Sequence, residues 1–428
     1  MASSLDVNHA IHSNTGAPQL TNSWGSLTAL LDAVLVNGYS EQIASKVTSN
    51  ASGVVTISFA GAHKYLRGQI LKLDGNSHEL KGKFRIQSVT DEAVVLKEKI
   101  SANKTENNVP VSVAPFGYEI AYSKKHKRAY KSLNPNNAMF YIVDDALWDG
   151  YTDDYAKIAS CGLATNLTDI DSISGYQCPF DSTDPHKNWS LLGTKGSVIK
   201  GWAKWCYRIW GIQDGQTYLT GSSGGAGSKW QIVGSDEFFY LALGVGDSAT
   251  DSYGNQLLYG AGKYDALDED NSLNYFLSAT INRNKASDYQ SIRSSLGTPD
   301  RLMPSYLFAN EDGTKVENNQ ALSVLPNAPD TSYPASSRDY NSSLTYNTSE
   351  SADLVKVLIN SLSDKKCVGS YKGLYAPLGA QERSALNHGK TVVIDNKLFV
   401  IVTYYSGSGS GPSSHQSLIY VLLDEDHD

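Results

Sequence analysis

His63 could act as a catalytic base. It ends an alternating apolar run in the stretch ISFAGAHKYLRGQILKLDG, residues 57 to 75. A catalytic histidine needs a nucleophile or a carboxylate within hydrogen-bond reach, and the spacing forces neither group close to His63. A lone histidine at a strand end is weak evidence for catalysis. We therefore interpret His63 as the corner of a small β-barrel.

Ser223 lies in GSSGG, residues 221 to 225, which matches the Gly-x-Ser-x-Gly pattern of serine hydrolases. In those enzymes the serine sits on a sharp turn between a strand and a helix. Here AGSKWQIVG follows, which predicts more loop and then a strand. The stretch also lacks the following helix that a phosphate-binding loop requires. We predict a loop without a nucleophile.

Acidic side chains could form a glycosidase pair, which requires two carboxyl groups roughly 5 to 10 Å apart. The candidates are Asp144 with Asp145, Asp153 with Asp154, and the run Asp265, Asp268, Glu269 and Asp270. Adjacent carboxylates in turns are typical of exposed loops, and the run lacks the pattern of a calcium loop. We therefore predict no catalytic residue, no cofactor site and no metal site.

The charge and cysteine content narrow the classes of partner. The net charge of −8 disfavours nucleic acid, which requires a basic face, and the basic run from Ser123 to Lys131 is short. Four cysteines, at 161, 178, 206 and 367, form no Cys-x-x-Cys pair, so we expect free, largely buried thiols. No signal peptide and no run of 18 apolar residues is present, so we predict no membrane span.

The composition predicts a mainly β protein. The 428 residues include 26 Tyr against 10 Phe, together with 36 Gly, which is typical of strands joined by many turns. Residues 1–45 are predicted to form a polar arm followed by an amphipathic helix, capped by Asn22 or Ser23 and ending before Gly38. We expect the arm to become ordered only by docking on a neighbouring subunit.

The remaining chain is predicted to form three β-rich parts. Residues 46–114 show five short alternating runs, which predict a small five-stranded barrel. Residues 115–303 predict a larger aromatic-rich β domain, in which Trp205 and Tyr207 share one face, and Trp202 and Trp210 the other. Residues 304–428 predict a loop-rich excursion to about residue 355, a short helix at 351–363, and a C-terminal hairpin that turns at Asp395 and Asn396 and returns to the main β domain.

The segment from Val54 to Glu98 resembles a module of bacteriophage tail and other virion proteins. The matching residues are Ala62-His63, Gly68, Ile70 to Leu73, and Gly82 to Phe84. The whole chain is similar to a group of phage virion structural proteins of tail or baseplate type. The motifs that carry this resemblance are Asn14 to Pro18, Leu30 to Ala33, Tyr130 to Ser132, Asp144-Asp145, Trp230 to Gly234, Phe239 to Leu241, and Gly373 to Leu378.

The resemblance implies a virion structural protein made in the host cytoplasm. It implies other virion proteins as partners, a symmetric homo-oligomer such as a ring, possible contact with the host surface, and no enzymatic activity. The structural or interface residues that it picks out are Asn14, Pro18, Leu30, Leu31, Trp230, Tyr240, Gly373, Leu374, Tyr375 and Pro377. The chain departs from the group at Val368 to Lys372, where an Arg-Gly-x-Leu-Pro run is usual.

Two alternatives stay open at this point. A head-decorating or receptor-binding virion protein would use the exposed Tyr and Asn side chains of residues 304–355 as its contact surface. An enzyme that degrades envelope glycans would use one of the acidic pairs, with aromatic side chains against the sugar.

Overall fold

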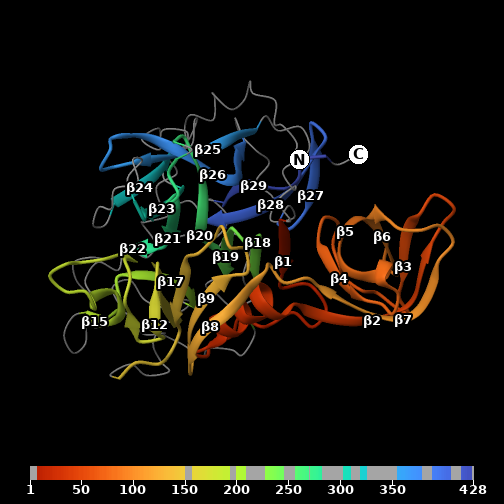
Figure 1. Ribbon diagram of the computed structural model, residues 1–428, viewed down its shortest axis with the longest axis horizontal. Helices are drawn as coiled ribbons and strands as arrows, with labels where there is room; N and C mark the ends of the chain where they lie inside the picture. The colour runs from red at the N-terminus through yellow and green to blue at the C-terminus, as the bar shows by residue number, and fades with distance from the viewer. Residues whose placement is uncertain are drawn as a thin grey trace.

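The structure is a computed structural model that describes residues 7–149, 157–192, 199–208, 227–244, 256–268, 270–281, 302–309, 319–324, 354–377, 388–405 and 416–426. Within these residues the protein is mainly β, as predicted. A closed barrel lies at one end of the molecule, and two larger sheets pack together beside it (Figure 1).

The barrel is formed by residues 39–113, all of them described, and has six strands rather than the predicted five. Its order is β2-β3-β6-β5-β4-β7. The bounds are β2 Tyr39–Ser49, β3 Val54–Ser58, β4 Ile70–Asp74, β5 Lys81–Val89, β6 Ala93–Lys99 and β7 Thr105–Val113. The prediction missed β2 because Ala44 and Val47 face the core while Ile43, just before them, is exposed, so β2 shows little apolar alternation.

One short helix follows the arm, and its start differs from the prediction. Helix α1 spans Ser26–Leu31 and continues as a π-helical turn, η1, over Asp32–Asn37. Gly38 ends it with φ 78°, as predicted, but the N-cap residue is Gly25, at φ 87°, rather than Asn22 or Ser23. A distant carboxylate, Asp145, supplies the missing cap: its Oδ2 accepts a 2.9 Å hydrogen bond from the Leu27 N–H.

A seven-stranded sheet follows the barrel within the described residues. Its order is β22-β17-β11-β10-β9-β8, with β14 paired to β11. The bounds are β8 Tyr118–Lys124, β9 Lys127–Ser132, β10 Phe140–Asp144, β11 Lys157–Ala164, β14 Gln177–Cys178, β17 Ala203–Arg208 and β22 Thr280–Ile281. Smaller elements beside it are β12 Leu167–Asp169, β13 Ser172–Ile173, η3 Lys187–Trp189, β15 Leu191–Leu192 and β16 Ile199–Lys200.

The larger sheet has twelve strands in the described part of the chain. Its order is β1-β18-β19-β20-β21-β23-β24-β25-β26-β29-β28-β27, and a further pairing of β20 with β26 closes a circuit of strands. The bounds are β1 Asn8–Ile11, β18 Trp230–Gly234, β19 Phe238–Gly244, β20 Gln256–Ala266, β21 Tyr275–Ser278, β23 Leu302–Leu307, β24 Asn319–Val324, β25 Leu354–Ser361, β26 Lys366–Pro377, β27 Thr391–Ile394, β28 Lys397–Tyr405 and β29 Gln416–Asp424.

This sheet corrects two sequence-based predictions. The helix predicted at 351–363 is wrong: the segment forms β25, paired with both β24 and β26. The predicted loop excursion contains β24 and most of β23, and the predicted boundary at 303/304 falls within β23. The C-terminal hairpin is confirmed, with Asp395 and Asn396 at φ 49° and 60° between β27 and β28.

Strand β19 is buried on both faces and separates two apolar cores. Phe239, Leu241 and Leu243 join a cluster that includes the leucines of α1 and the interior of the barrel. Phe238 and Tyr240 point to the other face, into a cluster shared with the C-terminal strands. This double burial explains why β19 reads as a continuous apolar run rather than an alternating one.

Candidate functional site

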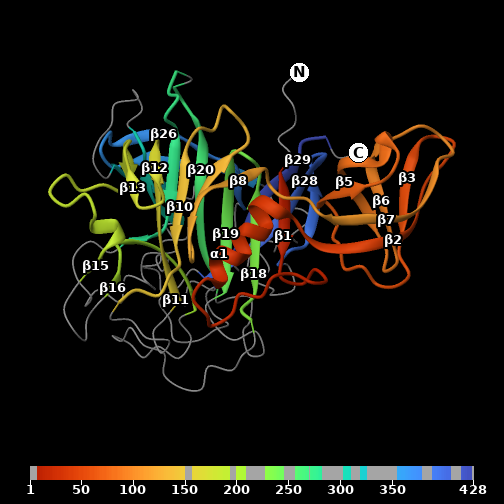
Figure 2. The ribbon, with the colours of Figure 1, turned by 60° about the horizontal axis from the view of Figure 1, so that its bottom comes forward.

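The N-terminal arm lies between the barrel and the large sheet. Strand β1 pairs antiparallel with β18, so that His9 lies opposite Val233 (Figure 2). Its other edge faces the barrel, where the His9 carbonyl accepts a 2.9 Å hydrogen bond from Gln69 Nε2. The prediction that the arm docks on a neighbouring subunit is therefore wrong for residues 8–11, since both of their edges bind to the same chain.

The Asn8 side chain binds backbone groups of the barrel. Its side-chain Oδ1 accepts a 2.8 Å hydrogen bond from the Ile70 N–H, and its Nδ2 donates to the carbonyls of Ile70 and Ala114 at 3.2 and 2.9 Å. One buried carboxamide thus satisfies three backbone groups at the rim of the barrel. The arm therefore binds the rim of the closed barrel where it faces the large sheet.

Asn14 is the centre of a buried polar network, which we call the arm junction (Asn8, His9, Asn14, Tyr39 and Gln69). The Asn14 Oδ1 accepts hydrogen bonds from the Tyr39 hydroxyl at 2.7 Å and from Gln69 Nε2 at 2.9 Å. Its Nδ2 donates to the Lys64 carbonyl at 2.8 Å. Burial raises the pKa of Tyr39, so its hydroxyl stays protonated and can donate.

Next to the arm junction, the charged barrel residue Arg85 binds the start of the arm and the C-terminal strand β29. Arg85 Nη1 donates to the carbonyls of Val7 and Gly68 at 3.1 and 2.8 Å, and its Nε lies 3.9 Å from Asp424 Oδ2. Burial opposes ionisation of Asp424, but the hydrogen bond from Lys97 and the charge of Arg85 outweigh it and lower the pKa of the carboxyl. The first and last described strands of the large sheet therefore meet at Arg85.

Trp230 fixes the next part of the arm. Its Nε1 donates a 2.9 Å hydrogen bond to the Pro18 carbonyl, and its ring lies edge-on to Tyr39 with 6.0 Å between centroids. Two motifs of the phage resemblance, one around Asn14 to Pro18 and one around Trp230, therefore meet in space.

His63 forms the barrel corner predicted from the sequence. Its side chain is buried, its Nδ1 accepts a 2.9 Å hydrogen bond from the Tyr65 N–H, and its Nε2 lies 3.3 Å from the Ala93 carbonyl. The Phe59 and Tyr65 rings pack against it, at 5.0 and 5.4 Å between centroids. Both ring nitrogens are thus occupied by backbone groups.

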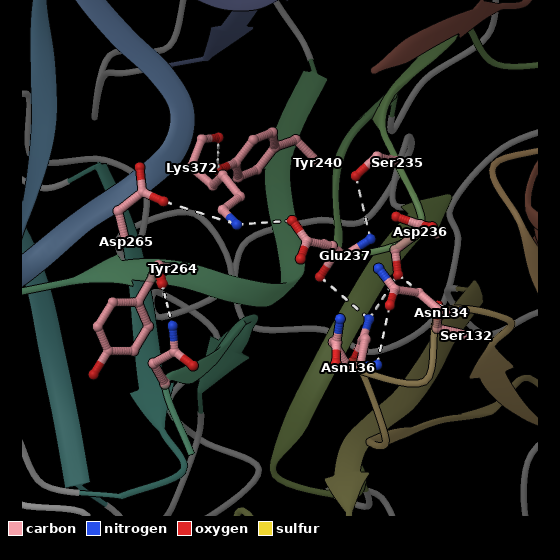
Figure 3. Close-up of polar contacts among 12 residues, drawn as sticks. Ser132, Asn134, Asn136, Ser235, Asp236, Glu237, Tyr240, Tyr264, Asp265 and Lys372 are labelled. Atoms are coloured by element: carbon pink, nitrogen blue, oxygen red, sulfur yellow. Dashed lines mark hydrogen bonds and ion pairs between the residues drawn. The ribbon is translucent and has the colours of Figure 1, made fainter. Parts of the chain in front are cut away.

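A second polar cluster surrounds the turn between β18 and β19 (Figure 3). Lys372 Nζ lies 2.7 Å from Glu237 Oε2 and 3.9 Å from Asp265 Oδ1, and the Tyr240 hydroxyl donates a 2.8 Å hydrogen bond to the Lys372 carbonyl. Lys372 and Glu237 are mostly buried, with 18% and 16% of their side-chain surface exposed. This turn cluster (Glu237, Tyr240, Asp265 and Lys372) joins β19, β20 and β26.

The same turn is held by the seven-stranded sheet. Ser132 Oγ and Asn137 Nδ2 both donate to the Asp236 carbonyl, at 2.6 and 2.7 Å, and Tyr141 donates to Asn137 Oδ1 at 2.9 Å. The Tyr130 to Ser132 motif therefore contacts the turn that joins the Trp230 to Gly234 motif to the Phe239 to Leu241 motif.

The residues predicted as structural or interface positions lie in three places. Asn14, Pro18 and Trp230 meet at the arm junction, and Leu30 and Leu31 are fully buried in the core beside it. Tyr240 contacts Lys372, and the next residue, Gly373, adopts φ 65°. Leu374 is buried in the apolar cluster that β19 shares with the C-terminal strands. Tyr375 and Pro377 lie at the end of β26, where Tyr375 packs edge-on to Phe399.

Of the acidic residues considered for catalysis, Asp144, Asp145 and Asp265 have structural partners in the described part of the chain. Asp144 and Asp145 are both buried. Asp145 accepts hydrogen bonds from the N–H of Leu27 and from the Tyr207 hydroxyl, and Asp144 Oδ1 accepts one from the Ala146 N–H at 3.1 Å. Asp265 joins the turn cluster. The pair at 153 and 154, Glu269 and Ser223 lie outside the described residues.

The four cysteines agree with the sequence-based expectation of unbridged, largely buried thiols. Cys161, Cys178 and Cys206 are buried, Cys367 is half-buried, and all four are outside any disulfide bond. Within the described residues, no group of three or more His, Cys, Asp or Glu side chains could hold a metal ion, and no helix there is long and apolar enough to cross a bilayer.

Sequence reasoning missed several residues that hold this scaffold. Gln69, Arg85 and Lys372 are polar, and each lies next to apolar residues in a strand or at its start. A charged residue at a position that should be buried, such as Arg85 between Phe84 and Ile86, is a usable signal that a partner lies elsewhere in the fold. The identity of that partner, Asp424, could not be read from the sequence.

No protein-family model matches the chain, and no curated protein matches it. Among solved structures, the phage phi92 endosialidase is similar over 91% of this chain and 52% of that chain, at 11% sequence identity and a TM-score of 0.15. The chain therefore spans about half the length of that structure. A likeness of this strength to a phage protein carries no argument about activity.

Proposed function

We propose that the chain is a structural protein of a bacteriophage particle, with its place in the tail or baseplate. The observation that carries the proposal is that the sequence motifs shared with phage virion proteins meet in one scaffold. The Asn14 to Pro18 motif meets Trp230 through the Pro18 carbonyl, and Ser132 of the Tyr130 to Ser132 motif binds the Asp236 carbonyl in the turn that follows Trp230 to Gly234.

The roles of the motif residues support a scaffold rather than a reaction centre. Asn14 and Trp230 bind backbone carbonyls, and Tyr240 donates to the Lys372 carbonyl. Such contacts fix the relative placement of barrel and sheets, which an assembling subunit needs in order to present a constant surface. The proposal includes a symmetric assembly and gives the chain no catalytic role.

Fractionation of purified particles tests the location. Heads and tails are separated, and the copy number of the chain is measured by quantitative mass spectrometry against the major capsid protein. We expect the chain in the tail fraction, at a copy number that matches a symmetric ring. Recovery with heads would support a decoration protein instead, and absence from assembled particles would exclude a virion role.

An enzyme assay distinguishes the structural role from the remaining alternative, an enzyme that degrades envelope glycans. Release of sugar from host envelope glycans by the purified chain would contradict the structural proposal. If sugar release occurs, the variants Asp265→Asn and Glu237→Gln show whether the turn cluster takes part. The matched control is Glu425→Gln, which changes an exposed carboxylate that pairs with Lys397 at the far end of the sheet.

A further inference from the structure

Lys204 is a buried cation whose ammonium has no hydrogen-bond partner among the described residues. Its side chain is fully buried on β17, and its Nζ has no hydrogen-bond acceptor among the described residues. Other lysines of this region have partners: Lys127 pairs with Asp171, Lys187 pairs with Asp181, and Lys131 lies over the Phe140 ring. Lys204 has no such hydrogen-bonded partner in the described part of the chain.

Ser160 is a second buried group without a partner, and it lies beside Lys204. The two residues are paired in register across β11 and β17, so their side chains stand on the same face of the sheet. Ser160 is fully buried, and its Oγ has no hydrogen-bond partner in the described part of the chain. Two unsatisfied hydrogen-bonding groups thus share one place in the core.

The groups around Lys204 do not neutralise it. Asp144 is paired in register with Ser160, one strand beyond, so its backbone lies roughly 10 Å from that of Lys204. The thiols of Cys206 and Cys161 are closer, but burial raises the pKa of Cys161, which keeps that thiol uncharged. Burial lowers the pKa of Lys204 to about 8, so at pH 7 most molecules still carry the ammonium.

A buried ammonium without a counter-ion is unfavourable, because removing the charge from water costs several kcal/mol. Lys204 supplies three N–H donors and Ser160 one O–H donor, so both groups can donate to a single acceptor. We propose that Lys204 and Ser160 together bind one small monovalent anion, a halide or a carboxylate of formate size, within the buried face of the seven-stranded sheet. This site is independent of the proposed virion role.

Thermal unfolding of the full chain tests the site. The midpoint temperature of unfolding is measured in gluconate and again after gluconate is replaced by about 100 mM chloride or formate at constant ionic strength. We expect this temperature to rise by about 3 °C with the ion that binds. Chloride and formate arms identify which ion is preferred. An equal midpoint in gluconate, chloride and formate would overturn the proposal.

Variants assign the effect to the two residues. Lys204→Met is expected to abolish the dependence on the anion, and Ser160→Ala to reduce it. Lys187→Met is the matched control, because it removes a lysine of the same region that already pairs with Asp181, and it should keep the full dependence. A chloride response that persists in Lys204→Met would contradict the site.

Bromide provides a readout that needs no variant. Crystals of the wild-type chain soaked in bromide should show an anomalous peak within hydrogen-bond reach of Lys204 Nζ and Ser160 Oγ. A fully ordered site without that peak would overturn the proposal, even where Lys204→Met does not fold.

Discussion

The Asp145 carboxylate caps a helix that lies 118 residues earlier in the chain, through its hydrogen bond from the Leu27 N–H. The same carboxylate accepts a 2.8 Å hydrogen bond from the Tyr207 hydroxyl. One buried side chain thus joins the N-terminal helix, β10 and β17. An acidic residue that could have served catalysis is instead a structural link between segments far apart in the sequence.

Asp145→Ala should lower the free energy of unfolding by about 3 kcal/mol, because it leaves helix N–H groups and the Tyr207 hydroxyl buried without an acceptor. Asp145→Asn keeps one acceptor oxygen and should cost less. Denaturant unfolding measures both. Asp149→Ala, at an exposed position, is the control and should stay within about 0.5 kcal/mol of wild type.

Asn14→Ala should loosen the arm. The change removes the buried acceptor of the Tyr39 hydroxyl and the partly buried donor to the Lys64 carbonyl, and should cost about 2 kcal/mol. Hydrogen exchange at the amides of residues 8–11 reports on the arm directly and should speed up. Ser13→Ala, an exposed neighbour, should leave that exchange unchanged, and equal protection in both variants would show that Asn14 does not hold the arm.

His9 should make the junction sensitive to acid. Burial, followed by the charge of Arg85, lowers the pKa of His9 to about 4, against the opposing hydrogen bond to the Arg67 carbonyl. The unfolded chain binds a proton near pH 6.5 and the folded one only near pH 4, so stability falls as the pH drops between these values, by about 3 kcal/mol in total.

The variant His9→Gln tests this dependence. Its unfolding free energy should change less than that of wild type between pH 6.5 and pH 4, since the difference between the two proteins isolates His9 from the carboxylates that titrate in the same range. His78→Gln, at an exposed position, should reproduce the wild-type profile. Parallel profiles for wild type and His9→Gln would contradict the assignment.

The Glu237–Lys372 pair should contribute more than a surface pair. Both side chains are mostly buried and 2.7 Å apart, so a double-mutant cycle with Glu237→Gln and Lys372→Met should give a coupling of about 1 to 2 kcal/mol. The exposed pair Lys397–Glu425 should give less than about 1 kcal/mol in the same experiment. Equal coupling in the two pairs would show that burial adds nothing at the turn cluster.

Local patterns predicted much of the fold. The alternating runs at Val54–Ser58 and Ala93–Lys99 are barrel strands because one face of each is buried, and the hairpin at Asp395 and Asn396 follows from a turn that tolerates positive φ. The misread segment at Leu354–Ser361 shows the limit. Its register shifts against β26 disturb the alternation, so that apolar residues recur at a spacing that also suits a helix.

The arm junction could not be predicted from the sequence. Asn14 and Gln69 are 55 residues apart, and nothing in either local pattern indicates that their carboxamides meet. Arg85 and Asp424 are both charged positions that a sequence pattern assigns to the surface, and only the tertiary fold shows that they are buried beside each other. Polar contacts between distant segments are set by packing, which local propensity does not encode.

The pairing of β1 with β18 has a consequence during translation. Strand β1 leaves the ribosome long before Trp230 is synthesised, because His12, which follows β1, and Trp230 are 218 positions apart. Until β18 has been synthesised, the nascent arm has only the barrel to bind. The circuit of strands can then close only after β26 emerges, so a chain released before Lys366 leaves Tyr264 to Ala266 of β20 without their strand partner, an open edge of the kind that favours aggregation.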